Sequence, residues 1–407
     1  MARNRPDLDR SVPVLLVKIG RYPQSHSAVG VVRSFGRAGV PVHAMVEDRL
    51  TPTAVSRHLT GAVVARTTGC EPEERLLEAV RGAARRVGRR CLPVTTDDEA
   101  AVLLAEHADE FRGQLLLPPV PAALPRRLAD KGELPALCAA AGVPTLRATA
   151  PDGREQLLET ARSLGYPLVL KNLAPFSRLS RPAVGHSTVV RDERALLAAC
   201  PDGTAGSVLA QEYLPDEHAE DWFTHLCCGP GGEPLVLFTG LKLRAWPPGG
   251  GVTTRARALP NPELAALAER FCRSVGYCGI ADLDWRLDRR TGRYHLVDFN
   301  PRTGAQFRLF ETAGGVDVVR ALHLSLTGRP VPSGPQRARS FAVGQLDAMS
   351  VVSGLRHERR LPRDVRPRRG TERAWLSLDD PAPAVAETAR FAVTEALRLV
   401  RAVRRGG

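Results

Sequence analysis

Two acidic side chains and an asparagine share one face of a predicted β-hairpin. Residues 281–302 read ADLDWRLDRRTGRYHLVDFNPR, in which apolar and polar residues alternate on both sides of a DRRTG turn. If the faces match across the hairpin, the side chains of Asp284, Asp298 and Asn300 converge. Two carboxylates and an amide oxygen are hard ligands that suit Mg²⁺ held between a protein and phosphate oxygens. Arg302 follows two residues later and can reach the same point. The alternative to a metal site is a hairpin face that is simply exposed to solvent.

Lysine is rare in this chain, which makes its positions informative. Of 57 lysine and arginine residues, only four are lysine, namely Lys18, Lys131, Lys171 and Lys242. A compact ammonium group that persists in so arginine-rich a chain is a candidate for a point charge directed at phosphate. The alternative for each of them is an ordinary surface lysine.

The hairpin and the lysines together resemble the ATP-grasp superfamily. The run VDFNPR is similar to the last metal-binding strand of that family, and Asp284 stands where the family has its earlier acidic ligand. Lys131 precedes a helix leading into GVP, and Lys171 ends the strand YPLVLK, like the two lysines that contact ATP phosphates in the family. The resemblance implies an enzyme that uses ATP to activate a carboxylate as an acyl phosphate and passes it to a nucleophile, usually an amine.

Residues 208–221, VLAQEYLPDEHAED, resemble the interdomain hinge of the family, against which the adenine lies. The resemblance places Gln211, Glu212 and Leu214 at the base. It assigns Glu220 to the ribose hydroxyls, because a carboxylate can accept a hydrogen bond from both. Taken alone, the segment is also consistent with an edge strand and a polar loop.

Residues 172–190 stand where the family has a glycine-rich loop over the phosphates, and they depart from that pattern. They contain one glycine, with hydroxyl and basic side chains around it, and backbone N–H groups there can still cradle a phosphate. The residues concerned are Ser177, Arg178, Ser180, Arg181, Gly185, His186 and Ser187.

Four cations lie on two strands predicted within residues 233–258, EPLVLFTGLKLRAWPPGGGVTTRARA, around a PPGGG turn. Lys242 and Arg244 share one strand face, as do Arg255 and Arg257. In a ligase this face would meet ATP phosphate and the substrate carboxylate. A solvated strand is the alternative.

The N-terminal residues read as strands alternating with helices, which predicts a parallel sheet covered on both faces. Asp97 and Asp98 end one of these strands, at the edge where such sheets bind ligands. After them, Asp130 is predicted to cap a helix that places Lys131 at its start. The predicted strands are 12–20, 41–48, 91–98 and 114–120, and the predicted helices are 27–39, 73–87, 99–111 and 130–141.

The fold class expected from these patterns is a multidomain α/β and α+β chain. A parallel-sheet N-terminal domain precedes a two-lobed ATP-grasp fold and a C-terminal extension. The runs VVRSFGRAGVPVHA and KLRAWPPGGG are similar to bacterial carboxylate–amine ligases of the D-aspartate-ligase type. The expected parts are 1–124 (N-terminal domain), 125–210 (small lobe with a linker helix), 211–335 (catalytic lobe) and 336–407 (extension).

The composition narrows the class of protein further. No apolar run approaches the roughly 18 residues of a membrane span, and the eight cysteines form no CxxC pair, which indicates a reducing cytoplasm. The net charge of +13 is almost all arginine without interleaved aromatic residues, so no nucleic-acid partner is expected. A C-terminal helix with an apolar stripe at Ala392, Ala396, Leu399 and Val403 is expected to dock on the body, and contact with a membrane surface is the alternative.

The sequence therefore predicts a ligase that takes ATP, Mg²⁺ (or Mn²⁺), a small carboxylate and an amine, releases ADP and phosphate, and possesses no transmembrane segment. Amino acids or small peptides are the expected substrates, and a homodimer is compatible with the sequence. Two alternatives stay open. One is an ATP-grasp carboxylase acting through carboxyphosphate, and the other is a non-enzymatic basic protein that binds nucleic acid or a membrane surface.

Overall fold

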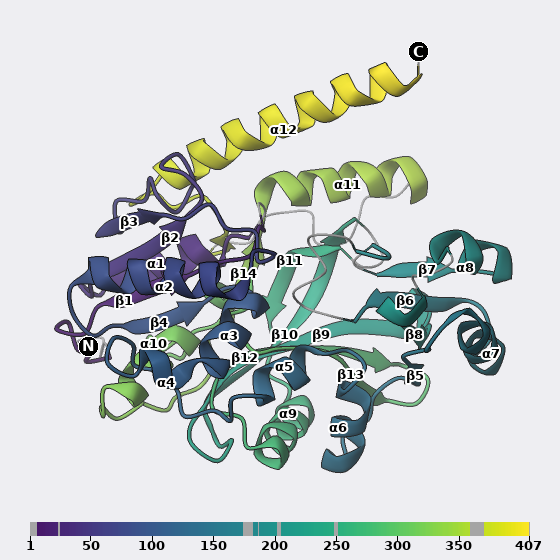
Figure 1. The fold of residues 1–407 in the computed structure, drawn as a ribbon, viewed down its shortest axis with the longest axis horizontal. Coiled ribbons are helices and arrows are strands. Elements are labelled where there is room, and N and C mark those ends of the chain that lie inside the picture. The colour runs from purple at the N-terminus through teal and green to yellow at the C-terminus, as the bar shows by residue number, and fades with distance from the viewer. Residues whose placement is uncertain are drawn as a thin grey trace.

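The computed structural model describes residues 6–22, 25–173, 182–185, 187–201, 205–247, 251–358 and 370–406. These residues form three sheets with helices on their faces (Figure 1). The architecture is that of a mixed α/β chain, as the sequence predicts. The proposed domain boundaries remain predictions.

The first sheet is parallel and lies near the N-terminus, as expected. Its order is β3–β2–β1–β4, and both of its faces are covered. Val14 and Leu16 of β1 share a core with α1, whereas Leu15 and Val17 share a second core with α2. A strand buried on both faces has to be apolar throughout, which explains the run VLLV. The elements are β1 (Val14–Val17), α1 (Ser27–Gly36), β2 (Val42–Val46), β3 (Gly61–Val64), α2 (Glu73–Val87) and β4 (Leu92–Thr95).

Two local predictions in this region need correction, and one strand was missed. The strand predicted at 114–120 is reduced to one bridge between Cys91 and Leu115, since the prolines that follow have no N–H to continue a ladder. The helix predicted at 99–111 is divided at His107 into α3 (Asp98–Glu106) and α4 (Ala108–Phe111). The short strand β3, which lacks a strong alternating pattern, was not predicted.

Asp130 does not cap the helix that follows it. It accepts hydrogen bonds from the backbone N–H groups of Gly132 (2.7 Å) and Glu133 (3.3 Å), and so closes a turn between α5 (Leu124–Ala129) and α6 (Leu134–Ala141). Lys131 lies in this turn and not in the first helical turn, which begins at Leu134. The turn projects Lys131 towards the second and third sheets.

The second sheet is the largest and contains the predicted hairpin. Its order is β13–β12–β9–β10–β11–β14–β15, and every neighbouring pair is antiparallel except β14 and β15. Helices α5, α6 and α9 cover one face, and α10 fills the space between the other face and the N-terminal sheet. The elements are β9 (Ala219–Cys228), β10 (Pro234–Trp246), β11 (Val252–Ala258), α9 (Pro262–Val275), β12 (Gly279–Asp288), β13 (Arg293–Asn300) and α10 (Val318–Leu326).

The residues expected to form an extension contribute to this large sheet. β14 (Ser340–Ala342) pairs with β11, β15 (Glu372–Arg373) pairs with β14, and α11 (Gly344–Glu358) lies over β10 and β11 (Figure 1). The C-terminal segment is therefore integrated into the large sheet.

The third sheet is small and antiparallel, in the order β5–β8–β6–β7. Helices α7 and α8 cover its outer face and share an apolar core with it. The predicted strand ending at Lys171 is confirmed as β6. The elements are β5 (Ala148–Thr149), α7 (Arg154–Leu164), β6 (Leu168–Asn172), β7 (Thr188–Val190), α8 (Glu193–Ala199) and β8 (Val208–Glu212), with 3-10 turns at Ala205–Ser207, Asp216–His218 and Phe307–Leu309.

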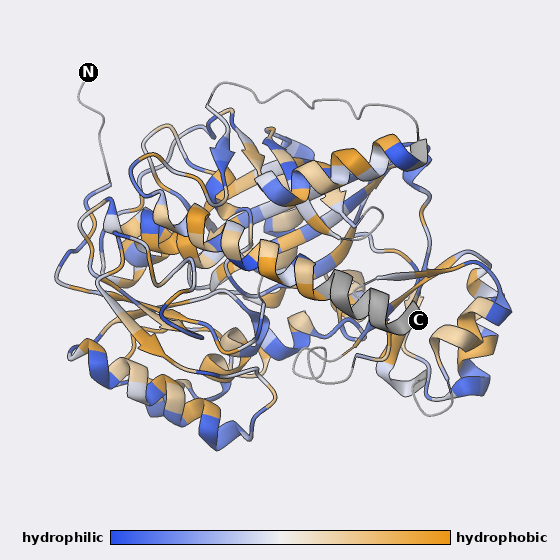
Figure 2. Cartoon of the chain, turned by 90° about the horizontal axis from the view of Figure 1, so that it is seen from above, coloured by the Kyte–Doolittle hydropathy of each residue, from blue (hydrophilic) through white to orange (hydrophobic). Residues whose placement is uncertain are grey.

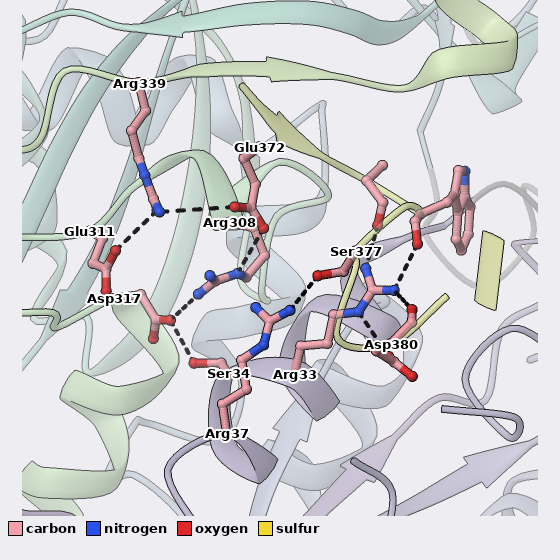
Figure 3. Close-up of polar contacts among 12 residues, drawn as sticks. Arg33, Ser34, Arg37, Arg308, Glu311, Asp317, Arg339, Glu372, Ser377 and Asp380 are labelled. Atoms are coloured by element: carbon pink, nitrogen blue, oxygen red, sulfur yellow. Dashed lines mark hydrogen bonds and ion pairs between the residues drawn. The ribbon is translucent and has the colours of Figure 1, made fainter. Parts of the chain in front are cut away.

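A buried polar network joins the C-terminal segment to α1 (Figure 3). The Arg33 guanidinium donates to the Asp380 carboxylate (2.9 Å) and to the carbonyl oxygen of Trp375 (2.7 Å). Next to it, the Ser34 hydroxyl donates to Asp317 (2.6 Å), the residue that caps α10. These contacts hold the N-terminal sheet against the large sheet.

The last helix, α12 (Ala382–Gly406), extends away from the body (Figures 1 and 2). Its first half docks as predicted, but through Ala384 and Phe391 and not through the predicted apolar stripe. Val385 and Val393 are 69% and 60% exposed. Ala392 and Ala396 of the stripe are also exposed, and the side chains of Leu399 and Val403 lie outside the described residues. No helix among the described residues is long and apolar enough to cross a membrane.

Candidate active site

A cavity of about 680 Å³ opens between the small sheet and the large sheet, beside α11. Strands β6 and β8 supply one wall, β10, β12 and β13 supply the other, and α11 adds Ser350 and Gly354. Its size suits a small-molecule ligand. Ten of the side chains expected to bind ATP, metal or substrate line it: Lys131, Lys171, Gln211, Glu212, Leu214, Glu220, Lys242, Arg244, Asp284 and Asp298.

The hairpin presents its carboxylates in the expected register. Asp284 lies directly opposite Asp298 in the β12–β13 ladder, while Leu283 and Phe299 are buried behind them. Asn300 is paired with Asp282 one step further along, and its side-chain N–H donates to the Asp282 carbonyl oxygen (3.1 Å). Asp284 and Asp298 thus reach the cavity together, whereas Asn300 does not line it.

Each of these carboxylates is paired with a lysine. The Lys131 Nζ atom lies 2.7 Å from Asp298, and the Lys242 Nζ atom lies 2.7 Å from Asp284. Burial disfavours the charge of Lys242, but the Asp284 carboxylate outweighs this and raises the lysine pKa. Burial, with the neighbouring Asp282 and Asp298, raises the pKa of Asp284 in spite of Lys242. The crowded carboxylates therefore favour additional positive charge at this point.

Lys171 faces the same carboxylates from the small sheet. Its Nζ atom donates to the carbonyl oxygen of Val297 (3.2 Å), and the side chain is buried. Burial and the nearby Lys131 ammonium lower the pKa of Lys171 to about 8, although Asp298 acts in the opposite direction. Two ammonium groups that repel each other in one cavity form a natural binding site for an anion.

The hinge residues lie along the outer part of the cavity. Gln211 and Glu212 belong to β8, and Gln211 is buried between β5 and β6. Leu214 is also buried. Glu220, at the start of β9, accepts from the indole N–H of Trp222 (3.2 Å) and lies 3.2 Å from Arg289. The structure thus places all four residues in the lining of the same cavity.

Arg302 lies outside the cavity lining, where it connects two sheets. Its guanidinium donates to Asp282 (2.9 Å), and its Nε atom lies 3.4 Å from Asp98 at the edge of the N-terminal sheet. The His225 ring lies 3.0 Å from the other oxygen of Asp282. Burial alone would raise the pKa of Asp282, but the positive charges around it hold the pKa below its ordinary range. The predicted strand-end Asp98 is thus joined to the hairpin through Arg302.

Of the four predicted cations of β10 and β11, Arg257 does not line the cavity, and the other three divide into two groups. Lys242 is part of the carboxylate site already described. Arg244 and Arg255 both contact Asp347 of α11, and only Arg244 lines the cavity. The phosphate loop is described only in part: Gly185 and Ser187 are placed, and Ser187 lines the cavity. Ser177, Arg178, Ser180, Arg181 and His186 lie outside the described residues.

Several lining residues were not predicted from the sequence. Arg286 of β12 donates to the Leu214 carbonyl oxygen (2.8 Å) and to Asp221 (2.7 Å), and so ties the hairpin to the hinge. Its position on the hairpin was a usable indication. For Ser350 and Gly354 of α11 the sequence offered no such indication, because no local pattern relates α11 to the hairpin.

No family model matches the chain. It is 21% identical over 335 residues to the D-aspartate ligase of Enterococcus faecium, covering 78% of this chain and 77% of the relative. It is 25% identical over 246 residues to the biotin carboxylase of Allochromatium vinosum, covering 56% of this chain and 53% of the relative. The fold matches N5-carboxyaminoimidazole synthetase from Staphylococcus aureus, solved with ADP (TM-score 0.61, 12% identity, 83% of each chain). It also matches Campylobacter jejuni biotin carboxylase, solved with an ATP analogue (TM-score 0.58, 15% identity, 79% of this chain and 72% of that one).

Proposed function

We propose that the chain belongs to the ATP-grasp superfamily and is an ATP-dependent ligase that joins a carboxylate to an amine. The observation that carries this proposal is the convergence of Lys131, Lys171, Asp284 and Asp298 on one cavity between two sheets. The likeness to D-aspartate ligase over most of both chains supports an amino acid or small peptide as substrate.

The residues present fit a divalent cation carried by the nucleotide. Asp284 and Asp298 lie opposite each other, and burial and mutual repulsion raise the pKa of Asp284. Asn300 uses its N–H group on the Asp282 carbonyl, which leaves the amide oxygen as its ligand atom. These are the oxygen donors that Mg²⁺ prefers, and Mn²⁺ suits them as well. The bound cation would neutralise phosphate charge during transfer.

Lys131 and Lys171 are assigned to the ATP phosphates. In the free protein Lys131 pairs with Asp298, so phosphate and metal would exchange partners with this ion pair on binding. Lys171 is already desolvated and gains a counter-charge when phosphate arrives, which favours its protonated form. Gln211, Glu212, Leu214 and Glu220 are assigned to the base and ribose.

The acid substrate is assigned to the wall formed by Lys242 and Arg244. A carboxylate there would attack the γ-phosphate of ATP and displace ADP, which gives an acyl phosphate. The amine would then attack the carbonyl carbon of the acyl phosphate and displace phosphate, which forms the amide. Positioning and electrostatic stabilisation supply the catalysis, and no protein nucleophile is needed. Arg255 and Arg302 stand one layer behind the cavity, so we assign them to positioning the groups in front of them.

A carboxylase acting through carboxyphosphate is the second candidate. The likeness to biotin carboxylase in sequence and to carboxyaminoimidazole synthetase in fold favours it. In that reaction bicarbonate takes the place of the organic acid.

Hydroxylamine trapping distinguishes these two reactions. The protein is incubated with ATP, Mg²⁺, hydroxylamine and a panel of amino acids and short peptides, and hydroxamate and ADP are quantified. We expect one acid to give equal amounts of hydroxamate and ADP. Lys171→Ala should abolish the formation of both products. Lys18→Ala is the matched control, because Lys18 is similarly buried but pairs with Glu47 outside the cavity. ADP release that depends on bicarbonate alone would contradict the ligase and support the carboxylase.

A further inference from the structure

A short linker, residues 213–218, leads from β8 of the small sheet to β9 of the large sheet. Its last residue, His218, accepts a hydrogen bond from the backbone N–H of Arg289 (2.8 Å). Among the described residues, no backbone hydrogen bond joins residues 213–215 to the large sheet. A backbone segment without such bonds needs side-chain contacts to keep a single shape.

Arg286 of β12 supplies these contacts. Its Nη2 atom donates to the Leu214 carbonyl oxygen (2.8 Å) and to the Asp216 carboxylate, and its Nη1 atom donates to Asp221 (2.7 Å), its direct neighbour in the β9–β12 ladder. The Arg286 side chain is 17% exposed. Burial would lower the pKa of Arg286, but the Asp221 and Asp216 carboxylates outweigh this and raise it. One charged guanidinium thus joins the linker to both central strands.

These contacts lie at the cavity wall. Arg286 lines the cavity together with all three of its partners, two residues after Asp284 on the same strand. Burial and the Lys131 ammonium lower the pKa of Lys171 most, and Arg286 acts in the same direction. Arg286 therefore stands between the linker and the phosphate-binding lysines.

The linker is restrained from two sides at Leu214, which is itself buried. Pro215 fixes its own φ at −59° and confines the residue before it to extended conformations. The charge-assisted bond from Arg286 then fixes the direction of the Leu214 carbonyl group. A wall held in one conformation before its ligand arrives lowers the cost of binding.

We propose that Arg286 is a positioning residue for the adenosine part of ATP. It holds the linker in the shape that receives the base, through Leu214. Through Asp221 it also holds the start of β9, where Glu220 is assigned to the ribose. This inference rests on the proposed ATP site, and it predicts a loss of affinity confined to the adenosine end of the nucleotide.

Calorimetry of the full chain with ATP, ADP and inorganic tripolyphosphate, each with Mg²⁺, tests this. Arg286→Ala should weaken ATP and ADP binding by at least about tenfold and leave tripolyphosphate binding within about twofold. Arg286→Lys keeps the charge but cannot span three acceptors, so it should lose nucleotide affinity in the same way. Lys171→Ala should instead weaken the binding of both ATP and tripolyphosphate.

Arg290→Ala is the matched control, because it removes the same charge from the same hairpin. Arg290 pairs with Asp288 (3.0 Å) and does not line the cavity, so all three affinities should stay within about twofold. Unchanged ATP affinity in folded Arg286→Ala, full affinity in Arg286→Lys, or an equal loss for tripolyphosphate would overturn the inference while the ATP site stands. If Arg286→Ala does not fold, Arg286→Lys decides. Absence of ATP binding by the unmodified protein would overturn the proposed function and the inference with it.

Discussion

Asp379 and Asp380 are neighbours in the chain, and their substitution should have very different consequences. Asp380 accepts from Arg33 (2.9 Å, Figure 3), and both ends of this ion pair are buried. The same carboxylate also accepts from the Ser56 hydroxyl (2.7 Å) and from the backbone N–H of Arg57 (3.0 Å). The Asp379 carboxylate pairs with Arg37 at 2.7 Å, but its side chain is 46% exposed.

The expected magnitudes follow from this difference in burial. Asp380→Asn leaves the Arg33 guanidinium buried without a counter-charge, which costs roughly 3–5 kcal/mol of unfolding free energy. Because Arg33 keeps its bonds to the carbonyl oxygens of Trp375 and Asp380, we expect the lower end, about 3 kcal/mol. Asp379→Asn removes an exposed pair worth about 0.2–1 kcal/mol. The two variants should therefore differ by at least about 2 kcal/mol.

Urea unfolding of the two variants at neutral pH, followed by tryptophan fluorescence, measures this difference. Burial would raise the pKa of Asp380, but its bonds to Ser56 and Arg33 outweigh that and lower it. Stability from this carboxylate is therefore present above its unfolded pKa and is lost as the pH falls through the lowered value. The gap between Asp380→Asn and the unmodified protein should shrink in acid. Equal unfolding midpoints for the two variants at neutral pH would refute this reasoning.

Three further predictions follow from single residues. Because the pKa of Lys171 is about 8, ATP affinity measured by calorimetry should fall about tenfold between pH 7 and pH 9, and Lys171→Arg should remove this dependence. Burial raises the pKa of Glu387 to about 7, so the charged carboxylate destabilises the folded state above that pH. Glu387→Gln should therefore increase the free energy of unfolding, measured in urea, by up to about 3 kcal/mol at pH 8 and leave it unchanged below pH 4. A Cβ atom on Gly304 would lie 2.2 Å from His225 and 2.6 Å from Asp282, so Gly304→Ala should cost about 1–3 kcal/mol in the same assay.

The parts of the site that depend on local pattern could be predicted. The alternation in the hairpin placed Asp284 and Asp298 on one face, and the register confirms that they are opposite each other. The strand ending at Lys171 was recognisable from its apolar run and the glycine that ends the preceding helix. Both features are set within one or two neighbouring elements, so the sequence contains them directly.

The parts that depend on long-range packing could not be predicted. Arg302 was expected beside the metal ligands, but its contacts with Asp282 and with Asp98, at the edge of the N-terminal sheet, leave it outside the cavity lining. Asp347 lies 103 residues from Arg244, in a segment that sequence patterns separated from the catalytic lobe. The residue pattern of a strand or a helix does not indicate which distant side chain it will contact. The wrong placement of Lys131 has a local cause, since an aspartate can cap a turn as readily as a helix.

The central claim is that this cavity couples ATP cleavage to the joining of a carboxylate and an amine. The most direct measurement is mass spectrometry of products from ATP, Mg²⁺ and pairs of amino acids or peptides, with ADP quantified in the same reaction. The account predicts one pair whose product is lighter than the two substrates by one water, formed in equal amount with ADP and lost in Lys171→Ala. Stoichiometric ADP release without any condensed product, for every pair tested, would contradict it.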